Sequence, residues 1–88
     1  MPEMVRLTRT AEATLERVGN EAILYDRARG SAHVLNGAAA RLWELCDGES
    51  TIDDVTSAFA SSFGLTESAV REDVERVVSA LRALHLLH

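Results

Sequence analysis

The sequence predicts an α+β fold: a three-stranded antiparallel sheet followed by three helices, winged-helix-like in outline. Between residues 13 and 36, three short segments roughly alternate apolar and polar residues and are separated by glycine-containing turns, which is typical of half-buried strands in a meander. From residue 37 onward, apolar residues recur every three or four positions, the spacing of amphipathic helices. Strands followed by a separate run of helices indicate an α+β domain.

The predicted strands cover Ala13–Val18, Glu21–Asp26 and Ser31–Asn36. Gly19 and Asn20 supply the first turn, and Gly30 can adopt the positive φ that the second hairpin loop requires. Residues 1–10 are polar and weakly patterned, so we expect either a loose arm, extending to residue 12, or an irregular first strand. The chain of 88 residues contains no repeat or linker, and we expect a single domain over residues 1–88.

The first helix is expected between Asn36, a plausible N-cap, and Gly48. One apolar face supports it, formed by Ala39, Leu42, Trp43 and Cys46.

The second helix is capped by Thr51, with Asp54 completing a variant of the capping box, and ends at Gly64. Its expected core residues are Ile52, Val55, Phe59 and Phe63. Thr66 caps the last helix, Glu67–Leu84, whose apolar stripe consists of Val70, Val74, Val77, Leu81 and Leu84.

The composition limits the class of protein. Fourteen acidic residues face nine arginines and no lysine, for a net charge of −5, which disfavours a nucleic-acid partner. A single cysteine cannot form an internal disulfide and fits a reducing compartment. The N-terminus has no apolar core of a signal peptide, and no apolar run approaches the roughly 20 residues of a membrane span. We therefore expect a cytoplasmic protein.

The residues with chemical potential all have simpler structural interpretations. Cys46 lies on an apolar helix stripe and is expected to be a small buried hydrophobe. His85 and His88 lie at a C-terminus that we expect to be frayed, without partners for a metal. The Asp53-Asp54 pair suits a helix N-terminus, and no phosphate-binding loop or nucleophile motif occurs. We expect no enzyme, metal or cofactor.

Two features indicate binding instead. The last two helices, joined by "GLT", have helix-turn-helix spacing, so a winged-helix DNA-binding regulator is one alternative. The second of these helices nevertheless begins with more acidic residues than arginines.

The other feature is the third strand, "SAHVLN", which lacks the charge or proline that usually protects an outer strand. If it is an outer strand, it can pair with an incoming peptide by β-augmentation. The alternatives are that the last helix covers it, or that the chain is a small structural subunit of a larger enzyme. His33 in this strand is either an ordinary strand residue or a surface contact.

Two long stretches, "LYDRARGSAHVLNGAAARLWELCDGESTIDDV" and "VREDVERVVSALRALHLL", closely resemble the PqqD-like family of peptide-binding domains, also called RiPP recognition elements. RiPPs are ribosomally made, post-translationally modified peptides. The resemblance covers about residues 13–87. The matching features are Leu35-Asn36, the following alanines, Trp43, Asp47-Gly48, Asp73-Val74 and the closing leucines.

This resemblance implies a non-catalytic chaperone that binds the leader of a precursor peptide on its third strand, beside the last helix. It also implies presentation of that precursor to a maturation enzyme, such as a radical-SAM protein or a protease and cyclase. On the last helix we favour the flank that carries Val78 between two arginines over the flank of Asp73, Arg76 and Ala80. The resulting candidate contacts are Ser31, Ala32, His33, Val34, Leu35, Arg71, Asp73, Val74, Val78 and Arg82.

Overall fold

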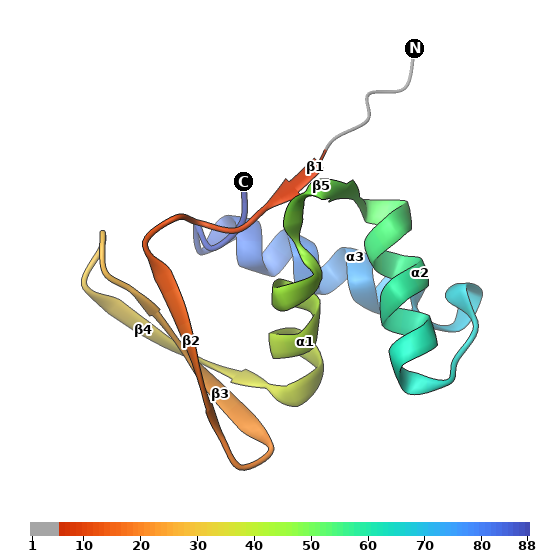
Figure 1. Cartoon of the computed structure of the whole chain (residues 1–88), viewed down its shortest axis with the longest axis horizontal. Helices are drawn as coiled ribbons and strands as arrows, with labels where there is room; N and C mark the ends of the chain where they lie inside the picture. Colours follow the sequence, from red (N-terminus) through yellow and green to blue (C-terminus); the bar gives the residue numbers. More distant parts are fainter. Residues whose placement is uncertain (1–5) are drawn as a thin grey trace.

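The computed structural model describes residues 6–88 and contains a mixed α/β fold with three helices, all on one side of a three-stranded antiparallel sheet (Figure 1). The sheet has the order β2-β3-β4, and a separate two-stranded sheet pairs β1 with β5. In chain order the elements are β1 Arg6–Thr8, β2 Ala13–Val18, β3 Glu21–Asp26, β4 Ser31–Asn36, α1 Gly37–Leu45, β5 Asp47–Thr51, α2 Ile52–Phe63 and α3 Glu67–Ala83.

The predicted meander is confirmed with its strand bounds. β2 pairs with β3, and β3 with β4, both in unbroken antiparallel register. Gly19 and Gly30 take φ of 62° and 64° in the two turns, a region that glycine enters without steric cost. Gly37, directly after β4, brings its backbone so close to the first turn that a Cβ would lie 3.0 Å from the Asn20 carbonyl oxygen. The junction between sheet and α1 therefore favours a glycine, because any side chain there would displace the Asn20 carbonyl by a few tenths of an ångström.

All three predicted helix caps are present. Asn36 accepts a hydrogen bond from the amide of Ala39 at 2.8 Å. Thr51 and Asp54 form the reciprocal capping box, and Thr66 accepts from Ala69 at 3.3 Å. These side chains satisfy amides that the first helical turn leaves without a partner. These local caps explain why the first residues of the helices were predictable from the sequence.

The irregular first strand, one of the two alternatives for the N-terminal residues, is present as β1, but its pairing with β5 was not predicted. The loose-arm alternative is wrong for residues 6–12, since Leu7 is 1% exposed and its strand pairs with β5. Residues 1–5 lie outside the described part of the chain. After α1 ends at Leu45, the carboxylate of Asp47 accepts from the amides of Glu49 and Ser50 at 2.9 and 2.8 Å, which lowers its pKa. This turn directs β5 toward β1 instead of prolonging the helix.

The C-terminus is anchored, and the expectation of a frayed end is wrong. His85 takes a φ of 60° after α3, and the reversed chain buries Leu86 and Leu87 completely or almost so. The Trp43 indole N–H donates to the Leu86 carbonyl at 3.0 Å, and the His88 amide donates to Thr8 at 2.8 Å. Trp43 thus joins α1 to the last residues of the chain.

One hydrophobic cluster connects the sheet and the helices. On α3, however, the predicted stripe is corrected at Val78 and Leu84. Val78 is 2% exposed, whereas Val77 is only half-buried and Leu84 is 42% exposed. Val77 and Val78 flank the stripe of Val70, Val74 and Leu81 on opposite sides, so the sequence pattern alone does not distinguish them.

Candidate functional site

β4 is an outer strand of its sheet. Within residues 6–88, the strand that pairs with it is β3, on one side only. Helix α3 packs mainly against α2 and does not cover β4. In an antiparallel edge strand, alternate N–H and C=O groups point away from the sheet. The strand therefore presents unpaired backbone groups along six residues, and none of its side chains is charged.

The side chains of β4 divide between the two faces of the sheet. Val34 is 68% exposed, and Ala32 lies on the same outer face. Ser31 and His33 are half-buried on the inner face, with 3.3 Å between the serine oxygen and the imidazole Nε2. Leu35, at 8% exposure, belongs to the core. Of the five candidate residues in this strand, Leu35 thus has only its backbone to offer a partner.

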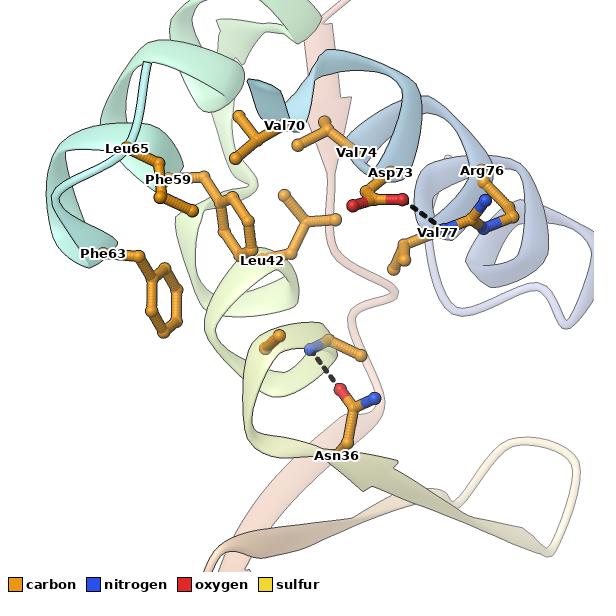
Figure 2. A pocket seen from close by; sticks show the side chains of 12 residues that line it. Asn36, Leu42, Phe59, Phe63, Leu65, Val70, Asp73, Val74, Arg76 and Val77 are labelled. Atoms are coloured by element: carbon orange, nitrogen blue, oxygen red, sulfur yellow. Dashed lines mark hydrogen bonds and ion pairs between the residues drawn. The ribbon is translucent and has the colours of Figure 1, made fainter. Parts of the chain in front are cut away.

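An apolar hollow of about 360 Å³ opens at the end of β4 (Figure 2). It lies between the start of α1, the end of α2 and the first half of α3. The residues that line it are Asn36, Ala38, Ala39, Leu42, Phe59, Phe63, Leu65, Val70, Asp73, Val74, Arg76 and Val77.

The two phenylalanines of α2 form one wall of the hollow. Their ring centroids are 4.8 Å apart at an interplanar angle of 52°, a tilted arrangement that aromatic pairs favour. Phe59 is buried, but Phe63 and Leu65 are 48% and 53% exposed. These partly exposed apolar side chains leave the hollow accessible to a ligand. Across from them, the Asp73 carboxylate pairs with Arg76 (Figure 2).

The family of coenzyme PQQ synthesis protein D (PqqD) matches residues 21–87. This chain belongs to the PqqD family. Among solved structures, the chain is similar to TbiB1 in complex with the TbiA(beta) leader peptide, with a TM-score of 0.75 and 17% identity. That match covers 92% of this chain and 94% of the other, and shows a shared fold. No curated protein matches the chain.

In this PqqD-family chain, α3 presents a different flank to the hollow from the one favoured on sequence. Asp73 and Val74 do line it, together with Arg76 and Val77. Val78 faces the core instead, because its side chain is almost completely buried. Val78 is therefore not accessible as a contact residue, and the flank of α3 that contacts a leader stays a prediction.

The two arginines of that flank lie elsewhere. Arg71 bonds to Asp53 of α2 at 2.8 Å and lies 3.7 Å from Glu67; this bond to Asp53 raises its pKa. Arg82 lies in the last turn of α3, outside the hollow.

Sequence reasoning missed Phe59, Phe63 and Leu65 as lining residues. The signal was present in part: Phe63 completes the apolar face of α2 and Leu65 is an apolar residue in the short turn "GLT". Both were interpretable as ordinary core residues, because sequence does not show how far a helix end projects beyond its neighbours.

The arginines of α3 also bear on the DNA-binding alternative. Arg71 and Arg76 are each engaged with carboxylates, and Glu67, Glu72 and Glu75 are exposed on the same helix. A recognition helix needs positive groups free to contact phosphates. The first half of α3 offers none, so its surface does not favour DNA.

Cys46 is a buried core residue, as predicted. It has no exposed surface, and its thiol donates to the Leu42 carbonyl at 3.2 Å. Burial raises the pKa of the Cys46 thiol to about 11. Across residues 6–88, no group of three acidic, histidine or cysteine side chains is arranged to hold a metal. Nor does this part of the chain contain a helix long and apolar enough to cross a membrane.

Proposed function

We propose that this chain binds the leader segment of a ribosomally made precursor peptide along β4 and presents it to a maturation enzyme, without catalysis of its own. The observation that carries the proposal is the free outer edge of β4 beside the apolar hollow. Membership of the PqqD family and the shared fold with TbiB1, whose structure contains a leader peptide, support it.

The edge would supply most of the affinity and the register. A leader segment in extended conformation adds a fourth strand, and its main-chain groups pair with those of β4. The side chains of β4 project to the two faces of the sheet and not along its edge, so they do not obstruct this approach. Successive leader side chains then point alternately to the inner and outer faces.

The hollow would supply selectivity. Its volume of about 360 Å³ is at the lower end of the ~300–1,000 Å³ of ligand pockets. Since Phe63, Leu65 and Val77 provide an apolar lining, it suits an apolar leader side chain next to the paired segment. The Asp73–Arg76 pair lies at its border, where a charged leader residue would compete with one partner.

Proline substitutions in β4 test the proposal. N–H groups of a strand alternate between its two sides, so one member of the pair His33→Pro and Val34→Pro removes a bond to β3 and the other a free donor. We expect the member that keeps the parent circular dichroism spectrum to lose about tenfold or more in leader affinity. Fluorescence anisotropy with the labelled leader of a candidate precursor peptide from the same organism measures it.

The matched controls are Leu15→Pro and Glu16→Pro in β2, the opposite outer strand. The folded member of this second pair should bind the leader within about twofold of the parent, because a proline there leaves the β4 edge intact. Equal losses in both strands, or undiminished affinity of the folded β4 variant, would contradict binding at β4.

A further inference from the structure

The outer face of the β2-β3-β4 sheet points away from all three helices (Figure 1). The strand registers place eight side chains on it, in the rows Thr14/Tyr25/Ala32, Glu16/Ile23/Val34 and Val18/Glu21. Asn36, the partner of Glu21 in the last row, turns its side chain to cap α1 and border the hollow instead.

The apolar side chains on this face are contiguous. Ile23 pairs directly with Val34, and Tyr25 with Ala32, on neighbouring strands. Val34 is 68% and Tyr25 38% exposed, with Val18 at 52% in the far row. Neighbouring apolar side chains that remain accessible on one sheet face make this face a candidate interaction surface.

The charges on the same face have one sign. Its only ionisable acids or bases other than the Tyr25 phenol are Glu16 and Glu21, on β2 and β3. Arg17, on the opposite face, bonds to Glu44 of α1. Within residues 6–88, neither Glu16 nor Glu21 forms an ion pair. The face thus combines an apolar centre at β3 and β4 with an acidic border toward β2.

We propose that this outer face docks the maturation enzyme, through a surface of that enzyme that is apolar at its centre and basic at its rim. The inference rests on the proposed function, because a leader strand paired with β4 extends the same sheet. Half of its side chains then lie next to Ala32 and Val34, so the enzyme contacts protein and leader together. A second copy of this chain fits the face less well, since each copy brings the same two carboxylates.

The geometry also explains how presentation avoids competition. Leader pairing uses the backbone edge of β4 and the hollow on the inner side, whereas docking uses side chains on the outer side. The two partners therefore bind at once, and the enzyme binds the leader-loaded chain more tightly than the empty chain.

Two double variants test this surface. Ile23→Thr/Tyr25→Thr removes apolar area while keeping residues that suit a strand, and Glu16→Arg/Glu21→Arg reverses the border charge. The charge-matched control is Glu49→Arg/Glu72→Arg, at exposed positions of β5 and α3. The probe is a purified candidate maturation enzyme from the same organism, a radical-SAM protein or a protease and cyclase, measured by biolayer interferometry on the immobilised full chain with and without leader.

We expect both face variants to weaken enzyme binding by about tenfold or more, with leader affinity within about twofold of the parent and the control unaffected. The inference is overturned if the parent does not bind the enzyme, or if the Glu16→Arg/Glu21→Arg variant binds it as tightly as the control. It is also overturned if ultracentrifugation shows a dimer of the parent that Ile23→Thr/Tyr25→Thr dissociates. Loss of leader binding in the parent, with enzyme binding retained, would instead contradict the proposed function.

Discussion

Two extended regions of this molecule differ in how far their backbone N–H and C=O groups are paired. At one end, β1, β5 and the last residues of the chain are joined by backbone pairing. β1 pairs with β5, Arg9 forms an antiparallel β-bridge with Leu87, and the His88 amide donates to the Thr8 carbonyl. At the other, β4 pairs with β3 and leaves its second side open. In the first, closed region, several backbone donors and acceptors are therefore paired within the fold, whereas the outer side of β4, the open region, has no strand partner within residues 6–88.

The two regions contribute unequally to the stability of the fold. The closed region buries Leu7, Leu86 and Leu87 at no more than 3% exposure, and apolar burial of this kind dominates folding free energy. The outer side of β4 buries little and exposes Val34. A free strand edge carries a risk of aggregation, and the proposed leader strand would cover this edge.

The largest expected effect lies in the closed region. Leu86→Ala removes a side chain with 0% exposure and should lower the free energy of unfolding by about 2–5 kcal/mol, through lost transfer energy and a cavity. Urea denaturation followed by circular dichroism measures this. Leu84→Ala, only two residues away but 42% exposed, is the matched control and should cost less than about 1 kcal/mol. Equal costs would show that the C-terminal residues are not part of the core.

A smaller effect is expected at the open region, on binding and not on stability. Phe63→Ala removes a ring that is 48% exposed and forms a wall of the hollow, so leader affinity should fall by about five- to tenfold, or roughly 1 kcal/mol. Isothermal titration calorimetry measures the affinity. Ser61→Ala, on an exposed position of the same helix turn, should leave affinity unchanged. If both variants bind as the parent does, the hollow does not contact the leader.

The smallest expected effect needs no mutation: it is the reactivity of Cys46, the residue between α1 and β5, toward an alkylating reagent. Because burial raises the pKa of the Cys46 thiol to about 11 from 9.0, the folded chain should resist iodoacetamide at pH 8 and react only after unfolding in urea. Mass spectrometry of the alkylated cysteine checks this.

The same pKa shift sets the sign of a pH effect. The unfolded thiol loses its proton first, so the contribution of Cys46 to stability is complete below pH 9 and declines between pH 9 and about 11. Rapid alkylation of the native chain at pH 8 would contradict the buried position.

Local signals in the sequence predicted most of the fold. Alternation marked the three strands of the meander, and the caps at Asn36, Thr51 and Thr66 marked the helix starts, because both depend on residues close together in the chain. The pairing of β1 with β5 and the anchoring of Leu86 join segments about 40 or more residues apart. No local pattern encodes such contacts.

The candidate site, too, was predictable where it depends on local sequence and not where it depends on long-range packing. "SAHVLN" was recognisable as an unprotected strand, and it is an outer strand in the structure. The wall opposite it was not recognisable, since Val77 and Val78 both suit an amphipathic helix and only packing decides which is buried. Phe63 and Leu65 border the hollow because α2 ends there and the chain turns at Gly64, a matter of tertiary geometry.

The most direct measurement of the central claim is a titration of the ¹⁵N-labelled chain with the leader of a candidate precursor peptide from the same organism, followed by amide chemical shifts. We predict shifts concentrated on residues 31–36 and on the first half of α3, with β2 and the paired β1 and β5 unchanged. Unshifted β4 amides at a saturating leader concentration, or shifts confined to another edge, would contradict the account.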